Sequence, residues 1–235
     1  MTKQQINYDD GTIFLSYHGN HGYFLPFVDY PMDHMAKNGP FDAWLKDKYT
    51  DGDITVLETD TVIDCGAFAA AFSIAAAGMG AKKVYAIEPS SRNYNCVLKN
   101  IDHFDALEVV QPINIGLGSE EAVLRLNLSE TSCDDSFLEP DQKTTGEYEE
   151  VRVRTLSDLI EELEIDASNL YLKVEAEGFE PEVIRGLGKY LPRVITVDVS
   201  AERNNESPRE QIREYLAPLG YQFRDTKRCL FAFLG

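Results

Sequence analysis

The stretch Val62-Ile-Asp-Cys-Gly-Ala-Phe-Ala-Ala-Ala-Phe-Ser-Ile-Ala-Ala-Ala-Gly78 decides the fold of this chain. It begins as an apolar strand over residues 61–64, turns at Gly66, and continues as an alanine-rich helix that stops at Gly78. A second apolar strand, residues 83–87, ends directly before Glu88. Strand, glycine turn, helix, strand and acidic residue form the layout of a βαβ unit that binds a nucleoside. The glycine lets the backbone approach the ligand, the helix N-terminus offers unpaired N–H groups, and the carboxylate can accept both ribose hydroxyls.

This turn holds a single glycine, and the residues after it are Ala67, Phe68, Ala69 and Ala70. A dinucleotide site needs the run G-x-G-x-x-G, whose later glycines make room for a pyrophosphate. The turn therefore favours a ligand that has a ribose and no phosphates. The alternative is a plain strand–loop–helix element in the core of another α/β protein. Residues 65–81 carry no charge, but alanine and glycine dominate them, so we expect a buried helix and not a membrane span.

Composition restricts the partners of the protein. The 235 residues include 40 acidic and 22 basic side chains, which gives a net charge of −18. Such a field repels nucleic acid and anionic membrane surfaces, so neither is expected as a partner. The N-terminus is polar and lacks an apolar signal segment, which predicts a cytoplasmic, acidic protein. Assembly into a homo-oligomer is left open.

The chain divides into two parts. An apolar content of 43% suffices for one domain with a sizeable core, which we expect over residues 55–235. Residues 1–54 form an N-terminal extension that acts as a lid or cap, or packs on the sheet. His18 and His21 in this part are candidates for a substrate-side role, because a metal site would need a further ligand nearby.

Strands and helices alternate after the opening unit. Buried strands are predicted at residues 107–111, 170–174 and 194–198. Helices are predicted after Pro89, Thr155, Pro181 and Pro208. Two alternating strands at 122–127 and 150–154 flank an acidic loop, residues 114–118 form a further loop, and a hairpin closes the chain at 220–225 and 229–233. The prediction is an α/β fold with five parallel strands and a C-terminal antiparallel hairpin.

Four segments taken together resemble the FkbM family of methyltransferases. They are Ile63-Asp64-Cys65-Gly66-Ala67, Val84-Tyr-Ala-Ile-Glu88-Pro89, Arg154-Thr-Leu-Ser-Asp158-Leu, and Leu172-Lys173-Val-Glu175-Ala-Glu177-Gly178-x-Glu180-x-x-Val-Ile-x-Gly186. The resemblance covers about residues 55–235. It implies a class I methyltransferase fold, Rossmann-like and doubly wound with a mostly parallel sheet. It also implies an S-adenosylmethionine-dependent enzyme, since members mostly O-methylate sugars, polyketides and other small molecules.

The resemblance assigns to the cofactor nine residues of the turns at the strand ends: Asp64, Gly66, Ala67, Phe68, Glu88, Pro89, Ser90, Asn114 and Ile115. The residues around Gly66 are expected to hold the methionine part. Glu88 is expected to hold the ribose, with its two successors beside it. Asn114 and Ile115 are expected near the adenine.

Lys173, Glu175 and Glu177 are the predicted catalytic residues, because the carboxyl end of the fourth parallel strand faces the ligand in such sheets. A hydroxyl acceptor benefits from a carboxylate that takes its proton, which favours Glu175 or Glu177 as the base and Lys173 as an orienting partner. The plain alternative is a structural ion pair at the strand end. A further alternative groups the two glutamates with Asp198 around Mg²⁺, although no metal is assigned to the site.

Two departures from the family pattern bear on activity. Phe68 and Ala70 stand where the family usually has Asn and Gly, and Glu175 stands where it usually has Asp. The longer side chain moves the carboxylate outward, which matters where geometry carries catalysis. Three hypotheses follow: a small-molecule O-methyltransferase, a catalytically silent S-adenosylmethionine-binding or scaffold protein, and a nucleotide-sugar or NAD enzyme. The missing glycines argue against the third.

Overall fold

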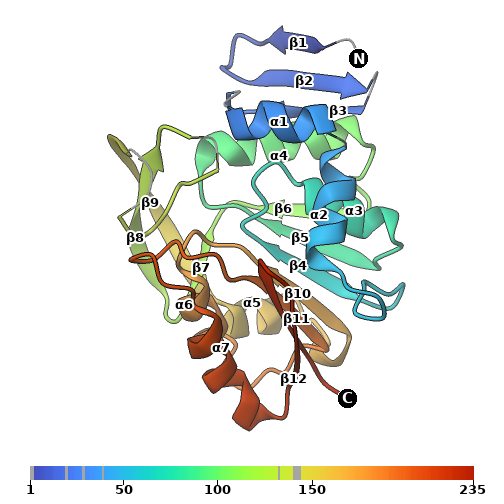
Figure 1. The fold of residues 1–235 in the computed structure, drawn as a ribbon, viewed down its shortest axis with the longest axis vertical. Helices are drawn as coiled ribbons and strands as arrows, with labels where there is room; N and C mark the ends of the chain where they lie inside the picture. The colour runs from blue at the N-terminus through green and yellow to red at the C-terminus, as the bar shows by residue number, and fades with distance from the viewer. Residues whose placement is uncertain (1–2, 19–20, 28–29, 39, 132, 140–143) are drawn as a thin grey trace.

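The computed structural model describes residues 3–18, 21–27, 30–38, 40–131, 133–139 and 144–235. A seven-stranded sheet lies at its centre, with the strand order β12-β13-β11-β10-β4-β5-β6 (Figure 1). Five strands run parallel: β4 (Thr61–Cys65), β5 (Lys83–Ile87), β6 (Val110–Ile113), β10 (Leu170–Val174) and β11 (Val194–Asp198). The hairpin of β12 (Gln222–Asp225) and β13 (Cys229–Phe233) completes the sheet, with β13 antiparallel to β11. The predicted parallel set and closing hairpin are confirmed.

Helices cover both faces of this sheet. One face carries α3 (Ala71–Gly78) and α4 (Ser91–His103), and the other carries α5 (Leu156–Glu162), α6 (Glu180–Arg185) and α7 (Arg209–Leu216). Short 3-10 turns lie at Ala167–Asn169 and Ala217–Leu219. The Thr155 hydroxyl accepts a hydrogen bond from the Asp158 N–H at 3.1 Å, which confirms the predicted helix cap. The fold is therefore doubly wound.

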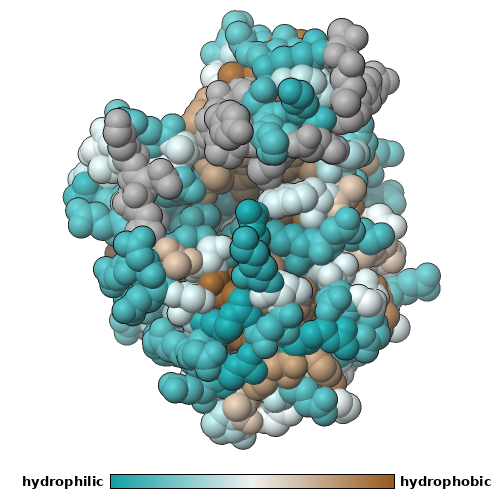
Figure 2. Space-filling model, viewed as in Figure 1, coloured by the Kyte–Doolittle hydropathy of each residue, from teal (hydrophilic) through white to brown (hydrophobic). Residues whose placement is uncertain are grey.

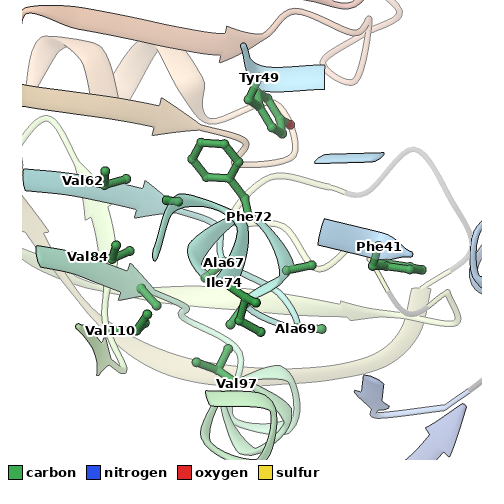
Figure 3. Packing of buried hydrophobic residues seen from close by; sticks show 14 of the residues in the cluster. Phe41, Tyr49, Val62, Ala67, Ala69, Phe72, Ile74, Val84, Val97 and Val110 are labelled. Carbon is green, nitrogen blue, oxygen red and sulfur yellow. The ribbon is translucent and has the colours of Figure 1, made fainter. Parts of the chain in front are cut away.

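Two hydrophobic cores result from the alternation of side chains along the strands. Val62 of β4 and Val84 of β5 pack toward Ile74 of α3 and Val97 of α4 (Figure 3). The next residue of β4, Ile63, points to the opposite core, under α5 to α7. The alanine-rich helix α3 is buried over Ala71–Ala76, as its composition predicts. None of the helices among the described residues has the length and apolarity needed to cross a membrane.

Two predicted boundaries are wrong. The third parallel strand begins at Val110 and not at residue 107, because the chain at 104–106 is still closing α4 and Leu107 is 57% exposed. The predicted loops at 114–118 and 128–149 are also shorter than expected. A second sheet of order β7-β9-β8 takes up much of both, with β7 (Gly116–Gly118), β8 (Ala122–Ser129) and β9 (Thr144–Thr155). The two strands predicted at 122–127 and 150–154 are present in β8 and β9, and β9 begins six residues earlier than predicted, at Thr144.

The N-terminal part forms a small antiparallel sheet and two helices. The sheet comprises β1 (Gln4–Asn7), β2 (Ile13–His18) and β3 (His21–Leu25), and α1 (Tyr30–Asn38) and α2 (Phe41–Tyr49) follow. The Asn100 side chain of α4 bonds the backbone N–H and C=O of Phe24 at 2.7 and 2.8 Å, which ties the small sheet to the main body. Helix α2 lies against α3 (Figure 1). The surface of the molecule is mostly hydrophilic on the face shown in Figure 2, with small apolar areas between the polar side chains.

Candidate functional site

A cavity of about 400 Å³ opens at the carboxyl ends of the central parallel strands. Gly66 follows β4, Glu88 follows β5, Glu175 follows β10 and Asp198 ends β11, and all four line it. From β4 the chain proceeds to β5 on one side, whereas β10 pairs with β4 on the other, so the strand order reverses here. Open α/β sheets bind ligands at this reversal, and the volume is that of a small-molecule site.

Glu88 forms one end of the cavity. Its Oε2 accepts the Phe68 N–H at 2.8 Å, and its Oε1 accepts the Ser90 N–H at 3.0 Å. Burial raises the pKa of this carboxyl to about 7, although these two hydrogen bonds oppose the shift. Pro89 and Ile115 lie beside Glu88 in the lining. We call this region the nucleoside end.

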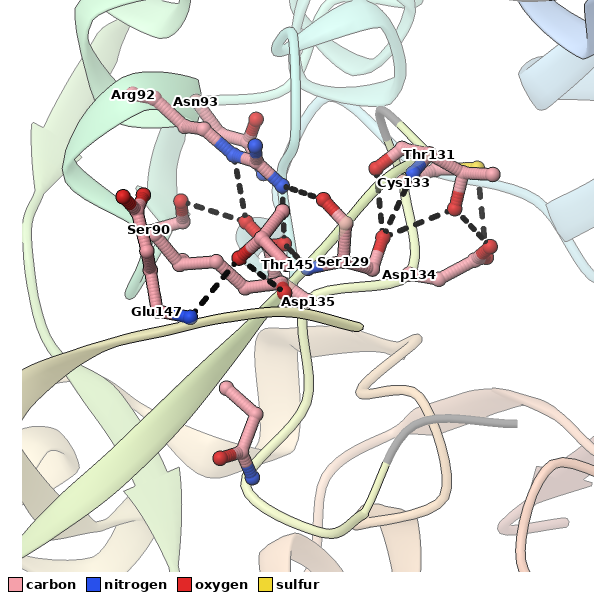
Figure 4. Close-up of polar contacts among 12 residues, drawn as sticks. Ser90, Arg92, Asn93, Ser129, Thr131, Cys133, Asp134, Asp135, Thr145 and Glu147 are labelled. Carbon is pink, nitrogen blue, oxygen red and sulfur yellow. Dashed lines mark hydrogen bonds and ion pairs between the residues drawn. The ribbon is translucent and has the colours of Figure 1, made fainter. Parts of the chain in front are cut away.

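Asn93 also belongs to the nucleoside end, and the sequence reasoning missed it. Its side chain lines the cavity although the residue is only 3% exposed. The signal was present, because Asn93 stands four and seven positions before Val97 and Asn100, both buried residues of α4. Asp135 lies close by, bound to the Arg92 guanidinium and to the Ser90 hydroxyl (Figure 4).

The backbone N–H groups of the turn after β4 were expected to be available to a ligand, but they are bonded within the protein. The N–H groups of Gly66 and Ala67 both bond the Ile87 carbonyl, at 3.0 and 2.9 Å, and the Phe68 N–H bonds Glu88. These donors are therefore used within the protein and are not offered to a ligand. Gly66 has φ +72°, and a Cβ built there would lie 1.8 Å from the Glu175 carbonyl oxygen. The glycine is required because two strand ends meet at this point.

Three predicted cofactor residues lie behind the lining of the cavity. Asp64 is fully buried, where its Oδ2 accepts the Ser73 hydroxyl at 2.6 Å and its Oδ1 pairs with Lys173 Nζ at 2.9 Å. The Ser90 hydroxyl bonds Asp135, and the Asn114 amide bonds the carbonyls of Glu88 and Pro89. These three side chains shape the site from outside the cavity. The remaining six line it: Gly66, Ala67, Phe68, Glu88, Pro89 and Ile115.

Lys173 supports the turn of β4. Besides Asp64, its ammonium donates to the Gly66 carbonyl at 2.7 Å and to the Cys65 carbonyl at 3.2 Å. Burial acts to lower the pKa of this lysine, but Asp64 and Glu175 outweigh burial and raise the pKa. Lys173 is therefore charged, and its hydrogen bond to the Gly66 carbonyl holds the turn in place.

Glu175 and Asp198 share a second lysine that sequence reasoning missed. Lys48 of α2 reaches the far end of the cavity, where its Nζ lies 2.5 Å from Glu175 Oε1 and 2.6 Å from Asp198 Oδ2. The Lys48 side chain is 8% exposed. Burial alone would raise the pKa of Glu175, but Lys48 and Lys173 lower it to about 2. We call this region the acceptor end. Spacing along the chain gave no signal for Lys48, since it lies 127 residues from Glu175.

The magnesium grouping of Glu175, Glu177 and Asp198 is not assembled. The Lys48 ammonium stands between Glu175 and Asp198, where a cation would have to lie. Across the described ranges, no three His, Cys, Asp or Glu side chains are arranged to hold a metal ion. His21 does not line the cavity either: it lies 2.8 Å from Asp42 in the N-terminal part, and the side chain of His18 falls outside the described residues.

Glu177 and Glu202 differ from Glu175 in forming no ion pair with any described cationic side chain, although Lys48 is near enough to lower the pKa of Glu202 slightly. Glu180 accepts the Ala176 and Gly178 N–H groups and so holds the turn that contains Glu177 at φ +47°. Both carboxyls line the cavity. Burial and the neighbouring Glu202 raise the pKa of Glu177 well above its usual value, and burial with nearby carboxylates raises that of Glu202 to about 9. At neutral pH this end of the cavity therefore retains a proton.

The sequence and the fold are similar to those of known methyltransferases. The family profile described as Methyltransferase FkbM domain matches residues 64–223. Among solved structures, the methyltransferase FkbM of Methylobacillus flagellatus is similar with a TM-score of 0.53 at 15% identity, covering 88% of this chain and 62% of that one. The protein PH0793 of Pyrococcus horikoshii gives a TM-score of 0.52 at 12% identity, covering 97% and 74% of the two chains. A comparison with curated proteins gives no match.

The fold is that of the class I S-adenosylmethionine-dependent methyltransferases. Within that class, the chain belongs to the FkbM methyltransferase family, since the profile covers both strand ends that build the nucleoside end and the strand that carries Glu175. The chain spans 62% of the length of the Methylobacillus protein. Lys48 and α2 lie before the matched residues, so the acceptor end combines residues inside and outside the matched range.

Proposed function

We propose that the protein transfers a methyl group from S-adenosylmethionine to a hydroxyl of a small molecule such as a sugar or a polyketide. The observation that carries this proposal is a single cavity that joins two chemically different ends. Glu88 and Asn93 at one end suit a ribose. Glu177 and Glu202 at the other suit a hydroxyl that must lose its proton.

The charges of the lining fit this cofactor better than a dinucleotide. Six lining side chains are carboxyls, namely Glu88, Asp135, Glu175, Glu177, Asp198 and Glu202, against three cationic side chains, Lys48, Lys173 and Arg228. An acidic cavity complements a sulfonium and an ammonium group and repels a pyrophosphate. The residues proposed to hold the cofactor are those lining the nucleoside end, with Asp64 acting only through Lys173. When bound, the cofactor supplies an electrophilic methyl group.

Glu177 is the proposed proton acceptor. A base whose pKa lies far below the working pH is a weak proton acceptor, which argues against Glu175 with its two lysines. The raised pKa of Glu177 keeps much of it protonated at neutral pH, but its ionised fraction takes a proton more readily than Glu175 does, and Glu202 can share that proton. Glu175 then orients the acceptor. Residues 1–54 act as the proposed cap, because Lys48 and Trp44 of α2 close this end of the cavity.

Binding and transfer can be tested separately. In titration calorimetry, S-adenosylhomocysteine should bind and NAD should not. Binding of NAD without binding of S-adenosylhomocysteine would refute the proposal. Transfer of an isotope-labelled methyl group to a panel of sugars and polyketide alcohols then tests the chemistry. With an acceptor in hand, Glu177→Gln should lower turnover by about 10²–10⁴-fold while S-adenosylhomocysteine affinity stays unchanged.

Glu175→Gln is the matched variant for this assay, because it makes the same chemical change two residues away. It should lower turnover less than Glu177→Gln. Equal losses in both variants would contradict the choice of Glu177 as the base. Binding of S-adenosylhomocysteine without transfer to any acceptor in the panel would favour the catalytically silent alternative.

A further inference from the structure

Asn93 lines the cavity, and its side chain carries a buried, unsatisfied oxygen. Its Oδ1 is buried and has no hydrogen-bond partner among the described residues. Its amide nitrogen lies 3.5 Å from Glu88 Oε1. That orientation of the amide is the chemically sensible one, because the opposite orientation would set the amide oxygen against a carboxylate. Figure 4 shows Asn93 beside the Arg92–Asp135 pair without a bond to any residue drawn there.

A buried acceptor without a donor is costly, and native proteins rarely keep one without a reason. Asn93 stands in the first turn of α4, directly after the Ser90 cap, so helix formation does not need an asparagine there. Its neighbour Asn100 on the same face of α4 is satisfied, with bonds from its amide nitrogen to Phe24 and Ala69. The difference between the two asparagines indicates that the missing donor of Asn93 comes from a ligand.

The hydrogen-bonding capacity of Glu88 points to the kind of ligand. Each carboxylate oxygen has two lone-pair directions; the Phe68 N–H uses one on Oε2, whereas the Ser90 N–H and the long contact from the Asn93 amide occupy Oε1, so free capacity remains on Oε2. The remaining capacity of Glu88 and the Asn93 oxygen form adjacent acceptors at one end of the cavity. Adjacent acceptors suit a pair of neighbouring hydroxyl groups.

We infer that Asn93 binds the nucleoside directly, with its Oδ1 accepting a hydrogen bond from one ribose hydroxyl while Glu88 accepts the other. This inference rests on the proposed function, since it takes the nucleoside to be that of S-adenosylmethionine. Asn93 is thus a specificity residue for an intact ribose diol. Glu88 alone would accept either hydroxyl, whereas the pair recognises both together.

The test compares Asn93→Ala with Asn95→Ala, a control in the same helix whose part-exposed side chain contacts Asp10 and does not line the cavity. Calorimetry with S-adenosylhomocysteine should show affinity about five- to thirtyfold weaker in Asn93→Ala and unchanged in Asn95→Ala. The ligand-free unfolding temperature of Asn93→Ala should stay equal or rise, because the change removes an unsatisfied acceptor. A role confined to structure would lower it.

Ligands that lack one hydroxyl locate the contact. Adenosine should bind more weakly to Asn93→Ala than to the parent. Of 2′-deoxyadenosine and 3′-deoxyadenosine, the one that lacks the hydroxyl bound by Asn93 should bind equally well to both proteins. Equal S-adenosylhomocysteine affinity in the parent and Asn93→Ala overturns the inference and leaves the proposed function standing, whereas a parent that does not bind S-adenosylhomocysteine overturns both. If Asn93→Ala does not fold, Asn93→Ser carries the same comparison.

Discussion

The nucleoside end and the acceptor end of the cavity both lie at the carboxyl edge of one sheet, yet the carboxyl groups of Glu88 and Glu175 have opposite electrostatic surroundings. At the nucleoside end, backbone N–H groups and a nearby amide surround Glu88, and none of the described cationic side chains pairs with it. At the acceptor end, Lys48 and Lys173 neutralise Glu175. The pKa values follow this difference, since Glu88 rises to about 7 and Glu175 falls to about 2.

The difference shows how each end is preorganised. At the nucleoside end, the acceptor atoms of Glu88 and Asn93 retain unused hydrogen-bonding capacity, and the hydroxyl groups of a ligand can supply the missing donors. The ion pairs at the acceptor end are complete in themselves, so they fix geometry without a ligand. Glu177 and Glu202 are the exception there, because both line the cavity and neither forms an ion pair among the described residues. The predictions below alter one end at a time.

The largest effect is expected at Gly66, where the two ends touch. Gly66→Ala should destabilise the fold by about 3–5 kcal/mol, because the new Cβ would meet the Glu175 carbonyl at 1.8 Å and the backbone is left-handed. Chemical denaturation measures this change. Gly78→Ala is the control, since nothing lies within 4 Å of its Cβ position. The control should be unchanged or up to about 1 kcal/mol more stable. Equal losses in both variants would refute the close approach.

Lys48→Met tests the acceptor end alone. Removing the ammonium leaves the buried Asp198 and the part-buried Glu175 with less compensation, so unfolding should become about 2–4 kcal/mol easier. Affinity for S-adenosylhomocysteine should stay within about threefold, because the ion pairs of Lys48 among the described residues are with Glu175 and Asp198 at the acceptor end. The exposed Lys46→Met on the same helix should change neither quantity. A tenfold loss of ligand affinity in Lys48→Met would show that the two ends are coupled.

The acid dependence of stability checks the same ion pair. The pKa of Glu175 is lowered from 4.5 to about 2, so its contribution is present above pH 4.5 and is lost as pH falls toward 2. In Lys48→Met the folded-state pKa of Glu175 rises, and this part of the acid dependence should shrink. Unfolding measured between these pH values in both proteins gives the comparison. An unchanged acid dependence would mean that Lys173 alone keeps Glu175 ionised.

The sequence predicted the nucleoside end better than the acceptor end, for a physical reason. Strand periodicity and Gly66 placed Glu88 at a strand end, because the βαβ unit is local in the chain. The helical spacing also placed Asn93 on the buried face of α4, but the sequence analysis did not identify it. Lys48 meets Glu175 only through the packing of α2 on α3, a contact between distant segments that no spacing rule encodes. Asp64, which was predicted to hold the cofactor, lies behind the cavity lining in a buried pair with Lys173, a contact that likewise joins distant parts of the chain.

The pH dependence of binding tests the nucleoside end. The pKa of Glu88 is about 7 in the free protein, and ligand hydroxyls donate to the ionised carboxylate. Affinity for S-adenosylhomocysteine should therefore be constant above pH 8 and fall below pH 7, by at most about tenfold per pH unit. Calorimetry from pH 6 to pH 8.5 measures it. Glu88→Gln should bind more weakly with a flat profile, and a persisting slope in that variant would assign the titration to another group.

The smallest effect concerns the turn that leads to the nucleoside end. Ala70 has φ +59°, in the left-handed region, at a position where the FkbM family usually has glycine. A non-glycine residue costs about 1–2 kcal/mol in this conformation. Ala70→Gly relieves that cost but also removes a fully buried methyl group worth about 0.8 kcal/mol, so stability should be unchanged or slightly higher.

Ala76→Gly separates these two terms, because Ala76 is equally buried but lies in the regular part of α3. It loses the same methyl group and also helix propensity, so it should be about 2 kcal/mol less stable than the parent. The difference between the two variants isolates the left-handed strain at Ala70. Because Ala70 does not line the cavity, S-adenosylhomocysteine affinity should remain within about twofold in Ala70→Gly. Equal destabilisation of both variants would show that Ala70 is unstrained, and weaker binding in Ala70→Gly would show that the strain at Ala70 is released when a ligand binds.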